Sequence, residues 1–209
     1  MRTLPDRKIT TRVSLYADDA ILFANPTRQE FNNIMGLLAL FGKATGLKIN
    51  SDKTCVAPIR CEDIDLQIVL QNFTGKIVGF PLTYLGLPIT ISRLRIMHLQ
   101  FILDRIRPRL AGWKGRLLSI AGRRVLVRSV LTALPTYALS VLRAPVKLLK
   151  DIDKVRGRFL WAGEEELTLG KCKVRWQQVC SPVQHGGLGI LSMTKFSRAL
   201  RLRWLWMSW

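Results

Sequence analysis

The sequence has few acidic residues, few cysteines and no long apolar run. Only 14 Asp and Glu stand against 33 Lys and Arg, which gives 209 residues a formal charge of +19. Four scattered cysteines are too few for a disulfide framework, so we expect an intracellular, reducing environment. The most apolar stretch, residues 131–142, is about half as long as a membrane span and contains a proline. We therefore expect no membrane partner.

The hydrophobic content and the charge distribution indicate a folded protein that binds polyanions. Hydrophobic residues make up 48% of the chain and charged residues 22%, which excludes a disordered polyelectrolyte. Residues 1–92 hold 10 basic and 8 acidic residues, whereas residues 93–209 hold 23 and 6. Because such an excess attracts polyanions, we expect nucleic acid to be the partner of the second region.

Short strands and helices alternate in the first region. Residues 13–16 and 20–24 read as two apolar strands around an acidic turn, and a helix is expected from Thr27, with capping-box spacing to Glu30, to Gly46. Residues 47–50 and 55–58 read as a further strand and turn, and residues 80–89 have strand character. With a short helix at 64–70, this predicts an α+β unit over residues 1–92.

The second region has the helical period instead. Leu94, Met97, Phe101, Ile102 and Ile106 share one face of an expected helix, which we expect Pro108 to kink or end. Further helices are expected from Ser119 to Leu134, from Pro145 and from Ser192, with irregular, Gly-rich chain over residues 162–190.

Asp18 and Asp19 are adjacent at the expected tip of the first hairpin. Two neighbouring carboxylates repel each other unless they are solvated or bridged by a cation. Hard oxygen ligands suit Mg²⁺, and a pair of such ions can catalyse nucleotidyl transfer. On chemistry, the hairpin is a candidate polymerase-type metal site; a solvated acidic turn is the alternative.

The motif Tyr16-Ala17-Asp18-Asp19 resembles the catalytic hairpin of reverse transcriptases, in the form found in plant-type LINE (non-LTR) retrotransposons. The resemblance continues in order along nearly the whole chain. The further segments that carry it are residues 41–54, 80–88, 111–114, 118–123, 159–161 and 186–189.

This resemblance implies a fold and a set of site residues. Residues 1–92 would be a partial palm, a small antiparallel sheet with helices; residues 93–160 a helical thumb-like region; and residues 161–209 the start of a connector region. Asp18 and Asp19 would bind Mg²⁺. Tyr16, Ala17 and Lys53 would assist in the active site, and Tyr84, Leu85 and Gly86 would form the primer grip.

The resemblance also implies a partner and a compartment. The nucleus is the expected location, and an RNA template with RNA:DNA or DNA duplex the expected ligand. The residues expected to contact it are Arg105, Arg109, Lys114, Arg123, Arg124 and Arg128. Trp113, Trp161 and Trp176 could stack on bases, although core packing is the more ordinary role of such residues.

The chain departs from the family at its start. Fifteen residues precede Tyr16, whereas these polymerases carry fingers and a third carboxylate upstream. We therefore predict a fragment of an RNA-directed DNA polymerase that is inactive by itself. An upstream segment supplied in trans could complete it, so its standing as an enzyme stays open. The alternatives are a non-catalytic nucleic-acid-binding protein and a genomic relic that does not fold stably.

A zinc site is not expected. Cys172, Cys180 and His185 have spacings that match no common zinc finger, and no fourth ligand is evident. We therefore assign no metal to this segment.

Overall fold

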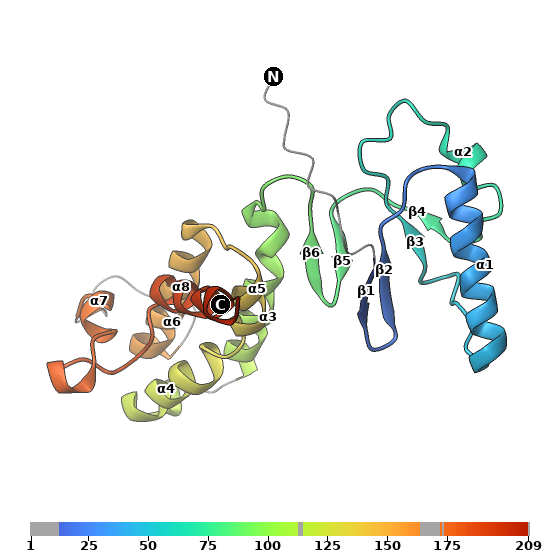
Figure 1. Ribbon diagram of the computed structural model, residues 1–209. Coiled ribbons are helices and arrows are strands. Elements are labelled where there is room, and N and C mark those ends of the chain that lie inside the picture. The colour runs from blue at the N-terminus through green and yellow to red at the C-terminus, as the bar shows by residue number, and fades with distance from the viewer. Residues whose placement is uncertain (1–12, 113–114, 164–171, 173, 209) are drawn as a thin grey trace, which may run out of the picture. The chain divides into compact units, whose positions relative to one another are not determined.

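The computed structural model describes residues 13–112, 115–163, 172 and 174–208 (Figure 1). Helices and short strands are mixed along the chain, which agrees with the predicted α+β class. The finer assignment to a palm and a thumb stays a prediction. The chain divides into two compact units, residues 1–80 and 81–209.

The first unit begins with the predicted hairpin. Strand β1 (Val13–Tyr16) pairs antiparallel with β2 (Asp19–Leu22), and Tyr16 lies opposite Asp19. The turn between the strands consists of Ala17, at a φ of 51°, and Asp18. The expected strands and acidic turn are confirmed, with the second strand starting one residue early.

Helix α1 (Arg28–Thr45) has the termini that the sequence predicts. The Thr27 side chain accepts a hydrogen bond from the Glu30 backbone N–H, and Gly46 ends the helix in the left-handed conformation at a φ of 76°. No residue of α1 is fully buried, however. The expected apolar face is therefore covered only in part within this unit.

The rest of the first unit is small. Strand β3 (Cys55–Val56) pairs parallel with β4 (Lys76–Ile77), a pairing the sequence did not predict, and α2 (Leu66–Val69) begins at its cap Asp65. Phe31 and Phe73 meet edge to face, with ring centroids 5.8 Å apart. Among the described residues of this unit, Leu70 is the one buried apolar side chain.

The second unit starts with another hairpin, in which β5 (Leu82–Tyr84) pairs antiparallel with β6 (Leu87–Ile89). Its turn residues, Leu85 and Gly86, have φ values of 50° and 73°. Two positive φ angles in a two-residue loop are typical of a type I′ turn, which explains the glycine.

Helices make up the remainder of the second unit. The segments Ile96–Leu99, Gly115–Leu117 and Val183–His185 are single 3₁₀ turns, and Val127–Leu131 is a π-helical continuation of α4. The α-helices are α3 (Gln100–Gly112), α4 (Ile120–Leu126), α5 (Thr136–Val141), α6 (Val146–Ala162), α7 (Trp176–Val179) and α8 (Met193–Met207).

Several helix predictions are confirmed, and two differ in part from the structure. Ser119 caps α4, and α6 and α8 begin directly after Pro145 and Ser192. Pro108 lies inside α3, which continues past it to Gly112, so Pro108 does not end the helix; a kink at this residue stays a prediction. Ile102 and Ile106 are buried as predicted, but Leu99 is buried in place of Met97, because residues 96–99 form a 3₁₀ turn that does not follow the α-helical period.

One apolar core holds the second unit together. Residues of α6 form its centre, among them Leu148, Ile152 and Phe159 at 0% exposure. Side chains of α3, the π-helical segment, α5 and α8 pack around them. In the described part of the chain, no helix has both the length and the apolar character of a membrane span.

The core also explains why the division into two compact units falls at residue 80. Leu87 of β6 is a member of the helical core. The Tyr137 hydroxyl of α5 donates a hydrogen bond to the Leu85 carbonyl at 2.9 Å. The β5–β6 hairpin is thereby fixed to the helices. Ile190 and Met193 also belong to this core. The predicted boundaries after residues 92 and 160 stay predictions.

Two glycines allow a close backbone crossing at the end of α6. A Cβ atom on Gly163 would lie 2.6 Å from the Gly115 carbonyl carbon, and Gly163 has a φ of 78°. A Cβ atom on Gly115 would in turn clash with the Gly163 carbonyl oxygen. Both positions therefore require glycine.

Candidate nucleic-acid interface

The Asp18–Asp19 pair lies on the surface of the first unit. Asp18 occupies the hairpin turn, Asp19 opens β2, and both are exposed. The neighbouring Tyr16 ring is 62% exposed. The hairpin presents two adjacent carboxylates to solvent, as expected from the sequence.

Lys53 lies in a turn of the same unit. Its backbone N–H donates to the Asn50 carbonyl and to the Asn50 Oδ1, each at 3.2 Å, and its side chain is exposed. The other predicted active-site group, Tyr84, Leu85 and Gly86, belongs to the second unit. The predicted active-site residues are thus divided between two units, and neither unit contains all of them.

Two of the predicted nucleic-acid-binding arginines point into the protein. Arg123 Nε donates to the Gly115 carbonyl at 2.9 Å, and Arg123 Nη1 donates to the Trp161 carbonyl at 3.0 Å and the Leu160 carbonyl at 3.4 Å. Arg124 Nε donates to the Leu188 carbonyl at 2.8 Å. These bonds give both residues a structural role, and their contact with nucleic acid stays a prediction.

The other predicted arginines lie at the surface. Arg105 and Arg109 are exposed on α3, and the Arg105 guanidinium lies 5.1 Å from the centroid of the Phe101 ring. Arg128 is exposed on the π-helical segment. Lys114 and Trp113 lie outside the described residues. The exposed side chains of Arg105, Arg109 and Arg128 are accessible to a phosphate.

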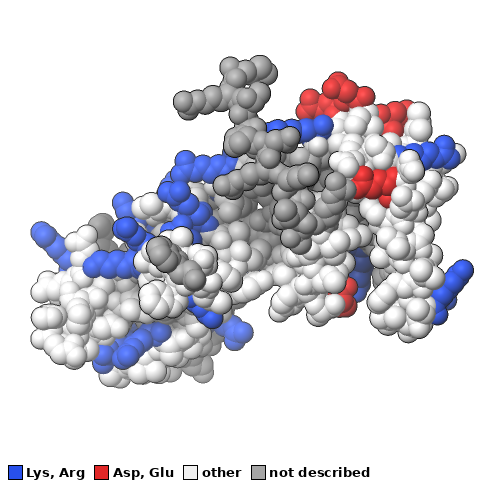
Figure 2. Space-filling view, in the orientation of Figure 1, with Lys and Arg blue, Asp and Glu red and all other residues white. Residues whose placement is uncertain are grey.

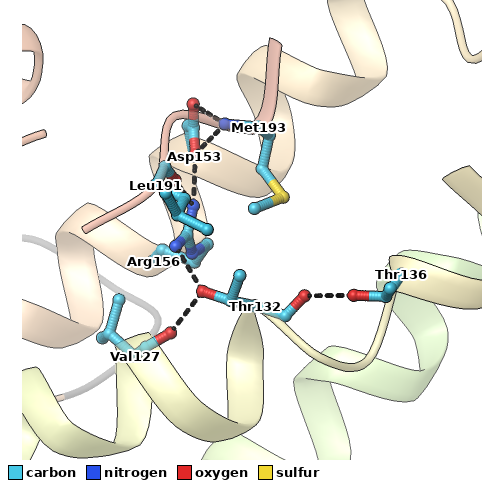
Figure 3. A network of polar contacts seen from close by, with 7 residues as sticks. All are labelled: Val127, Thr132, Thr136, Asp153, Arg156, Leu191 and Met193. Atoms are coloured by element: carbon cyan, nitrogen blue, oxygen red, sulfur yellow. Dashed lines mark hydrogen bonds and ion pairs between the residues drawn. The ribbon is translucent and has the colours of Figure 1, made fainter. Parts of the chain in front are cut away.

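A further arginine, Arg156 of α6, is completely buried in the second unit (Figure 3). Its Nη1 pairs with Asp153 Oδ1 at 2.7 Å and donates to the Leu191 carbonyl at 2.9 Å. Its Nη2 donates to the Thr132 hydroxyl at 2.7 Å. Sequence analysis made no separate prediction for Arg156, although its position three residues after Asp153 on an apolar helix face is a signal for an ion pair.

This network joins three parts of the unit. The Thr132 hydroxyl donates a hydrogen bond at 2.9 Å to the carbonyl of Val127, which lies in the π-helical segment. The Asp153 carboxylate accepts the Met193 backbone N–H at the start of α8, with Oδ2 at 3.2 Å. Arg156 and Asp153 therefore connect α6 with the π-helical segment and with the first residue of α8.

Burial governs the ionisation of this network. It raises the pKa of Asp153, which outweighs the opposing attraction of Arg156, and it lowers the pKa of Arg156. Cys180 lies beside the pair, and burial raises the pKa of its thiol from the ordinary 9.0 to about 11. The thiol is therefore in its neutral form at physiological pH.

Charge is distributed unequally between the two units. In Figure 2, acidic side chains are visible over the first unit, whereas basic side chains are spread over the helices of the second. The sequence of residues 81–209 contains 23 basic and 6 acidic residues, and one of those acids, Asp153, is paired with Arg156. The second unit is the polycationic part of the chain.

The tryptophans fall into two groups. Trp161 and Trp176 pack against the apolar core and are half-buried, so the core role considered for them is confirmed. The Trp176 ring also covers the Arg156 guanidinium, at 5.7 Å from the ring centroid. Trp204 and Trp206 of α8 are exposed, and sequence analysis did not predict a site for them.

The described residues contain no group of three or more His, Cys, Asp or Glu side chains placed to hold a metal ion. Cys172 is exposed and Cys180 is half-buried, and both are free thiols.

Comparison with known proteins gives one informative similarity. No protein-family model matches the chain. A protein of Arabidopsis thaliana named as a ribonuclease H protein is 33% identical over 114 residues, which is 54% of this chain and 18% of that protein. The chain thus corresponds to less than a fifth of this relative.

This similarity contradicts the predicted function. The relative is named for ribonuclease H and not for a polymerase, so the prediction of an RNA-directed DNA polymerase fragment acting by two-metal nucleotidyl transfer is wrong. That prediction depended on a short acidic hairpin and the order of several short segments, which can identify a stretch of chain without identifying its reaction. The resemblance to LINE elements is not tested by these comparisons and stays a prediction.

Proposed function

We propose that the helical unit, residues 81–209, binds nucleic acid as one segment of a ribonuclease H-related protein, and that its ligand is an RNA:DNA hybrid. The observation that carries the proposal is the excess of basic residues in this unit, 23 against 6 acidic. The name of the Arabidopsis relative supports the choice of ligand, since a ribonuclease H acts on RNA paired with DNA.

Counterion release makes such a unit a phosphate binder. Each Lys or Arg that neutralises a phosphate releases a condensed cation, and this favours binding at low salt without any contact to a base. Arg105, Arg109 and Arg128 are exposed, so they can reach phosphates. Arg156 is buried and cannot. The proposed surface is therefore made by the exposed arginines of α3 and the π-helical segment.

The test is the salt dependence of binding. A fluorescein-labelled RNA:DNA hybrid is titrated with the full chain from 50 to 200 mM KCl, and anisotropy gives the Kd. If about four phosphates are contacted, the affinity should fall by roughly 100-fold over this range. A Kd that does not change with salt, or the lack of binding at 50 mM, would contradict the proposal.

A matched pair of variants locates the surface. Replacing Arg105, Arg109 and Arg128 by Gln should reduce the salt slope by roughly one per lost phosphate contact. Replacing Lys43, Lys48 and Lys76 of the first unit by Gln removes the same formal charge and should leave the slope unchanged. Equal losses in the two variants would show that net charge, and not this surface, drives binding.

A third comparison addresses the kind of duplex. The same titration with double-stranded DNA and double-stranded RNA should give weaker binding than the hybrid, because the helical geometry of a hybrid differs from both. Equal affinity for all three would leave a nucleic-acid-binding unit without the proposed hybrid preference.

We also propose Mg²⁺ as the ion for the Asp18–Asp19 pair. Mg²⁺ is commonly held by one or two carboxylates and keeps several of its waters, which fits two exposed, adjacent side chains. Titration calorimetry should detect weak binding that the D18N/D19N variant loses. Unchanged heats in that variant would leave the pair as a solvated turn. The palm-like and thumb-like assignment of the two units is a prediction in the same sense.

A further inference from the structure

The outward face of α8 carries a row of exposed basic, apolar and aromatic side chains. Arg198, Leu202 and Trp206 follow one another at intervals of four residues, which places them on one line along the helix. All three are exposed, and the Trp206 side chain is 85% exposed. Arg203 precedes Trp206 by three residues and is also exposed. Two exposed arginines thus precede the exposed indole on the same side of the helix.

The opposite face of α8 fixes the helix in position. Met193 and Ser197 are fully buried, and the Trp204 indole N–H donates to the Ser140 carbonyl of α5 at 2.6 Å. The Met193 backbone N–H is held by Asp153. The exposed row is thus presented on a helix anchored at its first turn and near its last, so little conformational freedom is lost when a ligand binds.

The charge around the row indicates the kind of ligand. The sequence from residue 167 to residue 209 contains no Asp or Glu, and α8 itself contains four basic residues. A ligand for this face should therefore carry negative charge together with a flat apolar group. Successive nucleotides of a single strand combine both, because each has a phosphate and a base that can stack on an aromatic ring.

We propose that the outward face of α8 is a stacking platform for an unpaired strand, in which Trp206 stacks on a base and Arg198 and Arg203 contact the flanking phosphates. This inference rests on the proposed function and deepens it. The exposed arginines of α3 and the π-helical segment contact the duplex, and α8 holds the unpaired strand that continues from it.

The experiment measures the Kd for a fluorescein-labelled single-stranded RNA of twelve uridines, with the full chain and its variants. Trp206→Ala should bind about tenfold more weakly, because the loss of one base–aromatic stack has roughly this effect. Trp206→Phe retains a stacking ring and should bind within about threefold of the wild type. Met97→Ala, which removes another exposed apolar side chain of the same unit, should bind like the wild type.

The salt dependence separates stacking from charge. Trp206→Ala should leave the salt slope unchanged, whereas Arg198→Gln with Arg203→Gln should reduce it by up to about two. Circular dichroism should show the same helix content in every variant, since all the replaced side chains are exposed.

Three outcomes would overturn the inference. If the wild type binds the hybrid but Trp206→Ala binds the single strand equally well, the platform is refuted and the proposed function stands. If the wild type binds neither ligand, both fail. If Trp206→Ala keeps its affinity for RNA but no longer co-sediments with phosphatidylserine vesicles, the face binds an anionic membrane surface instead.

Discussion

Arg156 is a cation placed where apolar side chains are the rule. Three groups compensate its burial: the Asp153 carboxylate, the Leu191 carbonyl and the Thr132 hydroxyl. A buried ion pair of this kind gives little net stability compared with an apolar pair, but the loss of one partner leaves an uncompensated charge. The role of Arg156 is therefore to specify how three segments meet.

Replacing Arg156 by Met should destabilise the protein by about 3–5 kcal/mol, because Asp153 and Thr132 are left without their partner in the core. Urea denaturation followed by circular dichroism measures the change. Arg128→Met, at an exposed position, should stay within about 0.5 kcal/mol of the wild type. A loss below about 1 kcal/mol for Arg156→Met would show that these hydrogen bonds do not hold the three segments together.

Burial keeps the Cys180 thiol neutral over a wide range of pH. Its pKa in the folded protein, about 11, is above the ordinary 9.0, so folding favours the neutral thiol. The corresponding stability is fully present below pH 9 and is lost as the pH rises through 11. Mass spectrometry of iodoacetamide-treated protein at pH 8 should show Cys55 and Cys172 alkylated well before Cys180. Equal alkylation rates for the three cysteines would contradict the raised pKa of Cys180.

At the scale of elements, a side chain from another helix caps the C-terminal end of α6. The last carbonyls of a helix have no partner within it, and Arg123 of α4 donates to two of them, those of Leu160 and Trp161. The same guanidinium holds Gly115, whose backbone crosses that of Gly163. Arg123 thus joins α4, the end of α6 and the 3₁₀ turn Gly115–Leu117, which precedes α4.

Arg123→Ala and Arg128→Ala should have opposite consequences. The first removes hydrogen bonds from a charged donor and should lower the stability by about 1.5–3 kcal/mol. The second should leave the melting temperature unchanged and weaken hybrid binding. Thermal melts and anisotropy titrations of both variants give the comparison. If Arg123→Ala weakens binding without lowering the melting temperature, its predicted role as a phosphate contact would be favoured over its structural one.

Local signals predicted the elements whose boundaries depend on neighbouring residues. Thr27 and Gly46 delimit α1, and Pro145 precedes α6, as capping and proline geometry require. The π-helical segment was not predictable in this way. Its Val127 carbonyl is satisfied by Thr132, which is itself held by Arg156. A contact across 24 residues leaves no local pattern.

The continuation of α3 past Pro108 has a similar explanation. Proline removes one backbone hydrogen-bond donor from the helix, and for this reason a proline in a sequence is taken to kink or end a helix. Pro108 lies on the exposed side of α3, where water can satisfy the carbonyl that loses its partner. Whether a helix survives its proline thus depends on which face is buried, and this is a tertiary property.

At the scale of the whole molecule, the two units differ in what holds them together. The described part of the first unit has one buried apolar residue, Leu70, whereas the second has a contiguous core around α6. Burial of apolar surface is the main favourable contribution to folding. The alternative of a relic without a stable fold is therefore favoured more for the first unit, which has little core, than for the second, which has a contiguous one.

Hydrogen exchange of the full chain should show this difference. Amides of α6 should exchange at least about 100-fold more slowly than those of α1, since opening of α6 requires disruption of the core. Mass spectrometry of peptides from the two helices measures both in one sample. Equal protection would show that the first unit is stabilised by contacts beyond its own small core.

The sequence predicted the kind of ligand for the candidate site better than it predicted the residues that form the site. The excess of basic residues after residue 92 indicated a polyanion partner, and it remains the basis of the proposed function. The sequence did not separate Arg156, which is buried, or Arg123, which caps α6, from Arg105 and Arg128, which are exposed. Net charge can be summed along a sequence, but the direction of each guanidinium is decided by packing.

The crossing of Gly115 and Gly163 limits how the gene can change. Every codon substitution that replaces a glycine adds at least one carbon, and neither backbone has room for it. A genomic copy that no longer contributes to fitness would accumulate such replacements as readily as any others. The frequency of replacements at these two codons in related loci, compared with the surrounding codons, would therefore show whether selection acts on the folded protein.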